Sequence, residues 1–569
     1  MLLLEANQLL KYYEERLIFK CNTLKIYKKD RIGIVGLNGS GKTTLMDILA
    51  GTKEPDEGIV RRYGRYAYIQ QFEIHEDTYI PSEMNKIFSI SHPDVTTMSG
   101  GEKTRLKIAQ ALGSDSHILF ADEPTSNLDM KGIQMLEDML KNYKGAMVII
   151  SHDRQLLDAL CNKILEIEEG KVLEYQGNYS SYQAQKKEKL ARIQFEYEQY
   201  VSEKKRLTEA IQEKKEAAKT MRSTPSRMGN SEARLHKRSV NSKRAKLEKA
   251  SLSIESRLEK LEKKEKPKKI PKAQMDILDH QQLHRKVVIS GEGIEKAFGD
   301  KVLFKNLSFQ IPNQAKVALV GDNGTGKTTL LRMIINGDKA IESAKGTKVG
   351  YHSQNLEILD EDKTILENVM ETSIQSMSFC RTILARLLFK RDDVYKKVSI
   401  LSGGEKVKAA FAKIFVSDIN MIIMDEPTNY LDIYSMEALE EVLAEYQGTL
   451  LFVSHDRRFI DRIANRIILL EDQRAIQFEG NFTGYFDHIK EKSASTPQNI
   501  KEELMRLENC LSEVLGRLSM PGKNDDPAAL DAEYKSLLGK IKGLKQNQKI
   551  YEGKHKEIDI LKSITKRTY

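Results

Sequence analysis

The chain has no tryptophan, only four cysteines and no long apolar run, and each deficit excludes a class of protein. The cysteines lie far apart and form no CxxC pair, which argues against a zinc or iron–sulfur module and favours a reducing compartment. No run approaches the roughly 18 apolar residues of a membrane-spanning helix. The opening residues MLLLE are too short and too soon charged for a signal peptide. We therefore expect a cytoplasmic protein of two to four domains, without a membrane domain.

Positive charge is concentrated in one segment. The formal net charge is +9, yet residues 183–270 contain 26 Lys/Arg against 13 Asp/Glu, a net of +13 that leaves −4 for the rest. Where the signs alternate, in residues 183–218, a solvated helix is the favoured interpretation. Residues 219–249 hold ten basic residues and two acidic ones. That excess indicates a polyanionic partner, and we favour nucleic acid.

Two halves of the chain repeat one another. GLNGSGKT at residues 36–43 recurs as GDNGTGKT at residues 321–328, an offset of 285. Four later motifs recur at an offset of 303: SGGE, DEP, SHDR, and GN followed by an aromatic residue. Because the motifs keep a constant order, they predict a tandem duplication. The change of offset predicts additional residues in copy two between the first motif and SGGE.

The repeat predicts two α/β copies and two helical segments. Helix breakers between Pro225 and Asn230 place a turn in the first helical segment. Apolar residues at helical spacing on both sides of a PG pair predict a second helical hairpin near the end. The parts are copy one (1–182), the basic hairpin linker (183–285, with its tip at about 220–242), copy two (286–488) and the C-terminal extension (489–569).

In each copy, a short apolar strand runs directly into GxxxxGK[ST] and then into a helical pattern. This order identifies a phosphate-binding loop, because its backbone amides surround a phosphate at a helix N-terminus. Lys42 and Lys327 would reach the β- and γ-phosphates, and Thr43 and Thr328 would offer a hydroxyl to Mg²⁺. Two such matches in register make an ordinary glycine-rich turn a negligible explanation.

A second apolar strand in each copy ends in two acidic residues. The first can hold Mg²⁺ and the second can polarise an attacking water. Alone, such a pair could simply cap a strand, but behind a phosphate-binding loop it indicates catalysis. A lone histidine is usually structural, but His152 and His455 follow a third strand in the same frame, which suits a contact with the γ-phosphate. The acidic pairs are Asp122 with Glu123 and Asp425 with Glu426.

Together these motifs resemble the ABC ATPase family, whose signature loop is the SGGE segment. The resemblance implies an α/β fold with two tandem P-loop domains that bind ATP and Mg²⁺ head to tail. Two ATP sites would then form between the copies. One would join Lys42, Glu123 and His152 to Ser402 and Gly404, and the other would join Lys327, Glu426 and His455 to Ser99 and Gly101.

The resemblance assigns a role to each matching residue. The catalytic residues would be Glu123, His152, Glu426 and His455. The nucleotide-binding residues of copy one would be Tyr12, Gly36, Asn38, Gly39, Ser40, Gly41, Lys42, Thr43, Thr44, Gln71, Ser99, Gly100 and Gly101. Those of copy two would be Phe298, Gly321, Asn323, Gly324, Thr325, Gly326, Lys327, Thr328, Thr329, Gln354, Ser402, Gly403 and Gly404. The Mg²⁺ ligands would be Thr43, Gln71, Asp122, Thr328, Gln354 and Asp425.

Neither copy lacks a catalytic element, so both sites are expected to hydrolyse ATP by in-line attack of water. Two halves joined by a long basic helical linker resemble the ABC-F family of ribosome-binding translation factors. From Gln71 to Ser99 the chain runs 28 residues, against 48 from Gln354 to Ser402. That spacing leaves no room for the arm that housekeeping members often carry in copy one. The chain is therefore most similar to the antibiotic-resistance members of the Vga type.

The resemblance implies binding, in the ATP-bound state, at the E site of the bacterial 70S ribosome, mainly on the large subunit. The linker would approach the peptidyl-transferase centre of the 23S rRNA, shift the P-site tRNA and displace lincosamides, pleuromutilins and streptogramin A. Hydrolysis would release a ribosome-associated monomer whose ATPase domains pair within the chain, and no DNA partner is expected. Salt-sensitive RNA contacts are expected at Arg222, Arg227, Arg234, Lys237, Arg238, Lys243 and Arg244.

Three alternatives stay open. A tandem ATPase subunit of an importer would have no role for the basic hairpin. A DNA-repair ATPase would need zinc cysteines or much longer coiled coils. A general ABC-F translation factor without a resistance role differs only in its effect on drug susceptibility. A direct contact with the drug and an indirect, allosteric route are equally open.

Overall fold

The structure is a computed structural model. It describes residues 1–70, 98, 100–126, 128–220, 230–264, 266, 283, 285–299, 301–353, 358–390 and 392–485, together with short pieces between residues 504 and 541; for residues 230–239 it describes the backbone only.

Copy one is built on a nine-stranded sheet with the strand order β4-β1-β2-β9-β8-β3-β7-β6-β5. Strands β3, β6 and β7 pair in parallel and are apolar and largely buried, as expected where helices cover both faces of a sheet. The strands are β1 (Leu2–Tyr13), β2 (Arg16–Tyr27), β3 (Arg31–Gly36), β4 (Glu57–Arg62), β5 (Tyr66–Ile69), β6 (Ile118–Asp122), β7 (Ala146–Ile150), β8 (Lys163–Glu168) and β9 (Lys171–Gln176). The helices are α1 (Lys42–Ala50), α3 (Gly100–Gly113), α4 (Met130–Asn142) and α5 (Arg154–Leu160).

Copy two repeats this plan in two sheets, β11-β10-β13 and β14-β15-β16-β12-β17-β18. Helices α9 and α10 lie where the additional residues of copy two were expected. The strands are β10 (Val287–Phe298), β11 (Lys301–Pro312), β12 (Lys316–Gly321), β13 (Ile341–Ser343), β14 (Val349–His352), β15 (Met421–Asp425), β16 (Thr449–Val453), β17 (Arg466–Glu471) and β18 (Arg474–Glu479). The helices are α8 (Lys327–Ile335), α9 (Ile365–Glu371), α10 (Met377–Arg386), α11 (Gly403–Val416), α12 (Ile433–Glu445) and α13 (Arg457–Ile463), with 3₁₀ turns η1 (Asp393–Tyr395) and η2 (Val398–Ile400).

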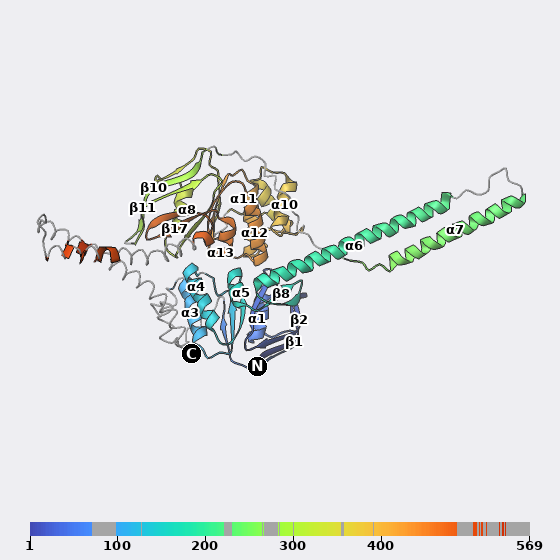
Figure 1. Ribbon diagram of the computed structural model, residues 1–569, viewed down its shortest axis with the longest axis horizontal. Helices are drawn as coiled ribbons and strands as arrows, with labels where there is room; N and C mark the ends of the chain where they lie inside the picture. The colour runs from blue at the N-terminus through green and yellow to red at the C-terminus, as the bar shows by residue number, and fades with distance from the viewer. Residues whose placement is uncertain are drawn as a thin grey trace.

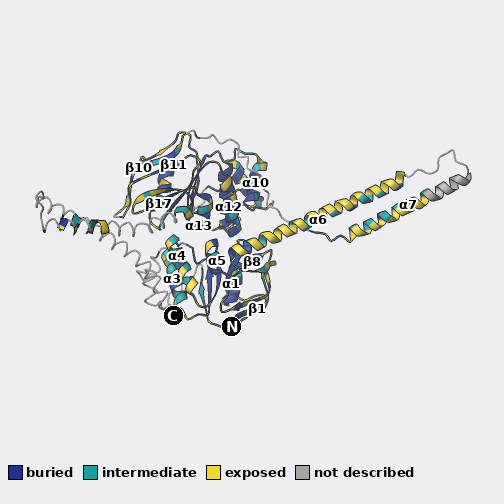
Figure 2. Ribbon diagram, viewed as in Figure 1, coloured by how far each residue is buried: buried dark blue, intermediate teal, exposed yellow. Residues whose placement is uncertain are grey.

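Two long helices form the linker. Helix α6 (Tyr179–Thr220) leaves copy one and α7 (Asn230–Glu259) runs back beside it, so the pair projects far from both copies (Figure 1). Most of its described surface is exposed (Figure 2), which fits its alternating charges. The expected turn at residues 221–229 and most of the expected C-terminal hairpin lie outside the described residues. Among the helices that are described, none is long and apolar enough to cross a membrane.

Where the copies meet, residues of copy one join the main apolar cluster of copy two. Leu157 of α5 and the first turns of α6, with Tyr179 and Tyr182 almost fully buried, pack into that cluster. The root of the linker is therefore part of the contact between the copies (Figure 1).

Candidate active sites

The phosphate-binding loop of each copy ends in a left-handed glycine before its helix. Gly41 has a φ of +94°, and a Cβ at this position would collide with Ile18 of β2. Gly326 has a φ of +96°, and a Cβ there would lie 2.7 Å from Phe304. Only glycine fits such a position without strain. Both loops thus present backbone amides at a helix N-terminus, the arrangement that holds a phosphate.

The lysines of these loops are buried and folded back onto the loops. The Nζ of Lys42 donates to two carbonyl oxygens of its own loop at 3.0 and 3.1 Å, and that of Lys327 does so at 2.8 and 3.0 Å. Burial lowers the pKa of both amino groups, while nearby carboxylates oppose this shift. Each lysine therefore lies beside the place that a phosphate would occupy.

A hydroxyl and a carboxylate meet beside each lysine. The Oγ1 of Thr43 donates to Oδ2 of Asp122 at 2.8 Å, and Thr328 hydrogen-bonds Asp425 in the same way. Burial raises the pKa of both aspartates, and the threonine hydroxyl opposes this shift. In the described part of the chain, Oδ1 of Asp425 is buried without a hydrogen-bond partner. These oxygens fit Mg²⁺, which prefers hard oxygen ligands.

The glutamate after each aspartate adopts a strained backbone conformation. Glu123 and Glu426 have φ values of +49° and +51°, a left-handed conformation that is costly for residues other than glycine and is common at functional sites. The Nε2 atoms of His152 and His455 lie 3.2 and 3.3 Å from Oε1 of these glutamates. The structure thus brings together the glutamate and histidine of each expected catalytic pair.

Burial dominates the ionisation of these pairs. It raises the pKa of Glu123 to about 8 and that of Glu426 to about 7, and the neighbouring aspartate adds to both shifts. It lowers the pKa of His152 to about 3 and that of His455 to about 4. At neutral pH both imidazoles are therefore neutral, and each carboxyl group titrates close to physiological pH, where a general base is useful.

The P-loop of copy one faces the SGGE segment of copy two. The backbone NH of Asn38 donates to Oδ2 of Asp432 at 2.9 Å, and its Nδ2 donates to the carbonyl of Tyr430 at 2.8 Å. A Cβ on Gly404 would lie 2.9 Å from Nδ2 of Asn38 and 2.5 Å from the Tyr430 oxygen. Ser402, two residues before Gly404, is the N-cap of α11. These contacts produce the expected head-to-tail arrangement at the site that contains Lys42.

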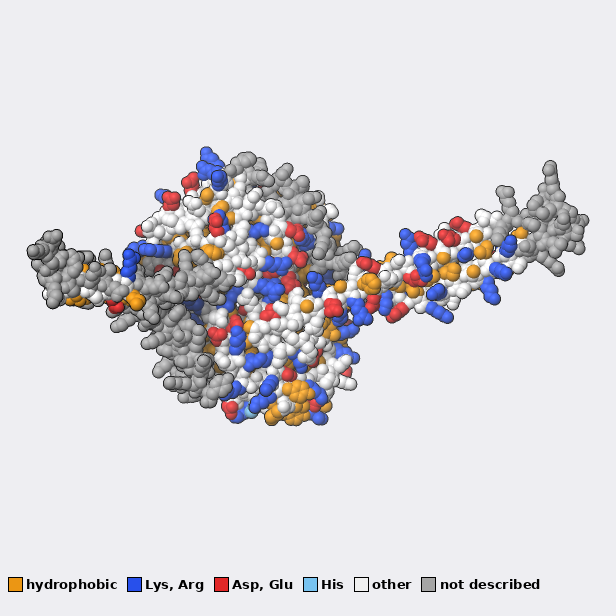
Figure 3. Space-filling view, viewed as in Figure 1, with side chains coloured by type: hydrophobic (Ala, Val, Ile, Leu, Met, Phe, Trp, Pro, Cys, Tyr) orange, Lys and Arg blue, Asp and Glu red, His pale blue; other side chains and the backbone are white. Residues whose placement is uncertain are grey.

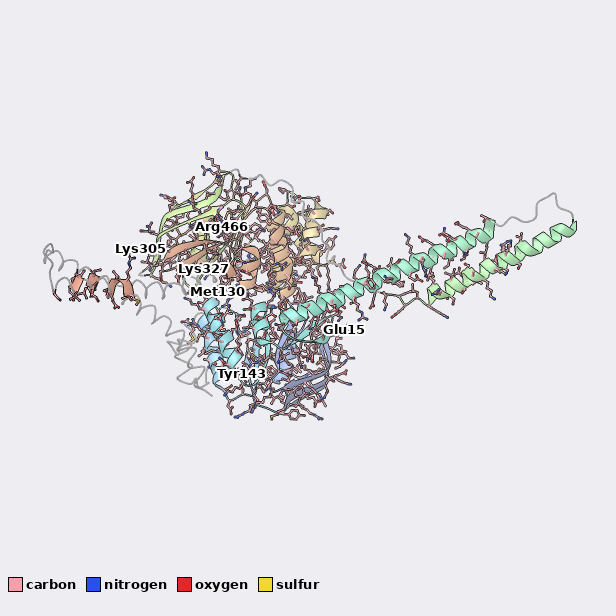
Figure 4. All side chains as sticks on the ribbon, viewed as in Figure 1. Glu15, Met130, Tyr143, Lys305, Lys327 and Arg466 are labelled. Atoms are coloured by element: carbon pink, nitrogen blue, oxygen red, sulfur yellow. The ribbon has the colours of Figure 1, made fainter. Side chains whose placement is uncertain are left out.

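The second site has a more exposed seam. The backbone NH of Asn323 donates to Oδ2 of Asp129 at 3.4 Å, and Lys131 pairs with Asp322 at 2.7 Å with both side chains largely exposed. Met130, at the start of α4, and Lys327, at the start of α8, lie at the junction of the copies (Figure 4). Gly100 and Gly101 begin α3.

Several expected site residues lie outside these contacts. Tyr12 and Phe298 are 40% and 58% exposed near the ends of β1 and β10. Gly36, Gly39, Ser40, Gly321, Gly324 and Thr325 lie in the two P-loops, Thr44 and Thr329 in the first turns of α1 and α8, and Gly403 at the start of α11. Gln71, Ser99, Gln354, Arg222 and Arg227 lie outside the described residues, as do the side chains of Arg234, Lys237 and Arg238. Lys243 and Arg244 are exposed on α7.

Sequence reasoning missed the aspartates that close the seam. Asp129 and Asp432 cap α4 and α12, and each also accepts a backbone NH from the opposite P-loop. Their signal was present, because NLD at residues 127–129 recurs as YLD at residues 430–432, again at an offset of 303.

The root of the linker is fastened to α12 of copy two. Tyr182 donates its hydroxyl to Glu166 at 2.7 Å and lies 2.7 Å from the hydroxyl of Tyr434. Lys186 forms an ion pair with Glu166, and its Nζ lies 4.7 Å from the centre of the Tyr434 ring. Burial alone would raise the pKa of Glu166, but hydrogen bonds from Lys186 and Tyr434 lower it. Helix α12 thus contacts both the P-loop of copy one and the linker.

A buried ionic cluster lies beside this root. Arg154 makes a bidentate ion pair with Glu440 of α12, and both side chains are fully buried. Asp456 lies 3.6 Å from Arg154, and Arg462 lies 2.6 Å from Glu440. Burial alone would lower the pKa of Arg154, but the two carboxylates raise it. At the corresponding position between the copies, the hydrogen bonds of Arg457 to described residues go to neutral acceptors, the side chain of Gln134 and the carbonyl of Met130, and its charge lowers the pKa of Asp153 against the effect of burial.

The comparisons with known proteins agree with this geometry. The family model described as "ABC transporter" matches residues 19–84, 69–126 and 304–429. The chain is 30% identical over 551 residues to "Ribosome protection protein VmlR" of Bacillus subtilis (strain 168), covering 94% of this chain and 97% of the relative. It is 35% identical to "Erythromycin resistance ATP-binding protein MsrA" of Staphylococcus epidermidis, covering 78% and 92%.

Two further likenesses bear on the family and the fold. "Energy-dependent translational throttle protein EttA" of Escherichia coli (strain K12) is 30% identical, covering 86% of this chain and 96% of the relative. The crystal structure of archaeal ribosome recycling factor aABCE1 with stalk protein aP1 matches with a TM-score of 0.56 at 19% identity, covering 86% and 92% of the two chains, which bears on the fold alone. The family match and the structural likeness confirm the expected α/β fold with two tandem ATPase domains and a helical linker.

Proposed function

The chain belongs to the ABC-F family of tandem ATPases, and from this premise we propose that it is an ATP-dependent ribosome-protection factor. As a member of that family it is an ATPase. Our proposal is that it binds the E site of the bacterial 70S ribosome and moves the P-site tRNA with its linker. Lincosamides, pleuromutilins and streptogramin A would then leave the peptidyl-transferase centre, and hydrolysis would release the protein.

One observation carries this proposal: the seam between a P-loop and the opposite copy is joined to a long exposed helical hairpin. Asp432 contacts the P-loop of copy one and caps α12, and Tyr434 of the same helix contacts the root of α6. A change in how the copies pair must therefore move the hairpin or strain its root. The relatives VmlR and MsrA, whose names refer to ribosome protection and erythromycin resistance, support resistance as its use.

The residues of each site would share the work of hydrolysis. The P-loop amides and Lys42 would bind the β- and γ-phosphates, and Thr43 with Asp122 would hold Mg²⁺, which neutralises charge on the phosphates. Glu123 would orient and polarise the attacking water, with His152 beside the γ-phosphate. The corresponding residues of copy two would act in the same way, and the opposing glycine-rich segment would complete each site.

The central test uses a double variant, Glu123→Gln with Glu426→Gln. We expect it to retain ATP, to hydrolyse it very slowly and to stay on 70S particles through a sucrose cushion, since release would need hydrolysis. Expression of the parent protein in a susceptible Gram-positive host should raise the inhibitory concentration of the three drug classes. Normal ATP turnover by the double variant would refute the role assigned to the glutamates.

The linker tip has a separate test. Replacing residues 222–230 by a short Gly/Ser turn should keep ATPase activity and abolish protection. Intact protection by this variant would remove the tip from the mechanism.

A general translation factor is the second candidate, because EttA is a relative at similar identity. Deletion of the gene separates the two functions. A drug susceptibility that stays unchanged, together with a defect in growth or translation, would favour this candidate over protection.

A further inference from the structure

One face of copy one carries aromatic and basic side chains that the sheet does not need. It is the outer face of the three antiparallel strands β2, β1 and β4. Tyr27 and Tyr63 are 45% and 50% exposed at one end of these strands, and Ile59 is 60% exposed further along β4. Lys25 and Arg61 lie two residues from the two tyrosines and share their face, because side chains alternate along a strand.

The register of the strands brings these residues into one patch. Lys25 and Arg61 both pair with Glu5 of β1, one from each side. The Nζ of Lys25 lies 3.3 Å from Glu5, and this interaction lowers the pKa of the glutamate. Lys28 and Lys29 extend the patch in the exposed turn after β2. We call Lys25, Tyr27, Lys28, Lys29, Arg61 and Tyr63 the β2–β4 face. Figure 3 shows hydrophobic side chains flanked by Lys and Arg at the end of the molecule where the chain begins.

Copy two provides an internal comparison, because the corresponding strands pair in the same register at these positions. Its residues at the corresponding ladder positions are neutral, acidic or small: Gln310 for Lys25, Pro312 for Tyr27, Asn313 and Gln314 for the two lysines, Glu342 for Arg61 and Ala344 for Tyr63. Counting the β1 position as well, with Glu5 against Ser290, the formal charge is +3 in copy one and −1 in copy two. Since both sheets fold, the fold does not require the residues of copy one.

We propose that the β2–β4 face is a second RNA-binding surface, separate from the linker, that takes a single-stranded or looped segment of RNA. Exposed tyrosines stack on unpaired bases, and the adjacent lysines and arginine neutralise phosphates. A protein partner would explain the tyrosines but not the three lysines beside them, because lysine is depleted at protein interfaces. The proposal rests on the proposed function for the origin of this RNA, which would be ribosomal.

A graft of copy-two residues tests the surface in the full-length protein. The variant Glu5→Ser/Lys25→Gln/Arg61→Glu/Tyr63→Ala installs the residues that copy two has at these four positions, including the serine opposite its glutamate, so the fold should persist and ATPase activity should stay unchanged. The control Gln310→Ala/Glu342→Ala changes the corresponding face of copy two. The probe is a fluorescein-labelled, mixed-sequence 20-nucleotide RNA, with binding followed by anisotropy between 50 and 200 mM salt.

We expect the graft to weaken RNA binding at least about fivefold, as expected for the loss of one stacked base. The slope of log K against log salt should fall by about 1.4, because two phosphate contacts are removed from a single strand. The control should match the parent. Tyr27→Phe should bind like the parent and Tyr27→Ala should not, and ultraviolet crosslinking should attach RNA to peptides that contain Tyr27 or Tyr63.

Two results would overturn this assignment. One is unchanged RNA affinity in the graft with crosslinks confined to the linker. The other is unchanged RNA affinity of the graft together with loss of its binding to a protein partner or to vesicles that contain anionic lipid. Sedimentation of the parent with 70S particles separates the two proposals. If the parent sediments and the graft keeps its RNA affinity, only the surface is wrong; if the parent binds neither ribosomes nor RNA, the proposed function fails as well.

Discussion

Removal of one partner of the buried pair between Arg154 and Glu440 should destabilise the protein more than removal of a partner of any exposed contact of the seam. Arg154→Met removes one partner of a fully buried ion pair, leaves Glu440 with Arg462 and takes the arginine away from Asp456. Such a loss costs about 3–5 kcal/mol, because a buried charge is left without compensation. Arg457→Met is the matched control, since within the described residues Arg457 hydrogen-bonds neutral acceptors, and it should cost about 1 kcal/mol.

These costs convert to a clear difference in thermal unfolding. For units of about 200 residues, 1 kcal/mol lowers the Tm by about 2–4 °C, so Arg154→Met should lower it by about 6–20 °C and Arg457→Met by only about 2–4 °C. Adding Glu440→Leu to Arg154→Met should restore much of the loss, because an apolar pair can replace a buried ion pair at little cost. Equal shifts for the two single variants, measured by scanning calorimetry, would refute the reasoning.

Three further outcomes follow from burial and close packing at the sites. Because burial raises the pKa values of Glu123 and Glu426 to about 8 and about 7, the rate of hydrolysis should rise with pH as each glutamate is ionised. In steady-state assays, Glu426→Gln, which leaves Glu123 active, should show a higher midpoint pH than Glu123→Gln, and a rate that does not change with pH would contradict this assignment. Gly404→Ala should slow hydrolysis, because a Cβ there would lie 2.5 Å from the Tyr430 oxygen of its own copy and 2.9 Å from Nδ2 of Asn38 in the opposite copy; an ATPase rate equal to that of the parent would exclude this packing. Burial lowers the pKa of His352 to about 4, whereas the unfolded chain binds this proton at about pH 6.5, so the histidine destabilises the folded state as the pH falls below about 6.5. In urea titrations near pH 4, His352→Leu should be more stable than the parent by up to about 3 kcal/mol, and a gain that does not depend on pH would argue against this role of His352.

The chemistry of each site could be predicted from the sequence because it resides in short local patterns. A strand followed by GxxxxGK[ST] fixes the loop around Lys42, and an apolar strand that ends in two acids fixes Asp122 and Glu123. The location of α9 and α10 also followed, since the repeat offset changes where they occur. Each of these inferences needs only residues that are close in the chain or aligned by the repeat.

Contacts across the seam could not be predicted in the same way. Arg154 and Arg457 occupy the same place in the repeated SHDR motif, yet one is buried against Glu440 and the other bonds Gln134. Glu440 itself corresponds to Glu137, which pairs with Lys141 on its own helix. The repeat therefore predicts equal environments, and the difference arises only from how the copies pack around the root of the linker. The β2–β4 face was missed for a similar reason, because its cations come from separate strands within a part of the chain whose summed charge is negative.

This difference in packing has a mechanical consequence. At the Lys42 site, separating the copies must break a buried ionic cluster and pull Tyr434 away from the root of α6, which loses the contacts of Tyr434 with Tyr182 and Lys186. At the Lys327 site, the separating contacts include Lys131 with Asp322, an exposed pair worth little. Among the residues that the structure describes, the Lys42 site therefore has more buried contacts across the copies than the Lys327 site, and these contacts lie at the linker root.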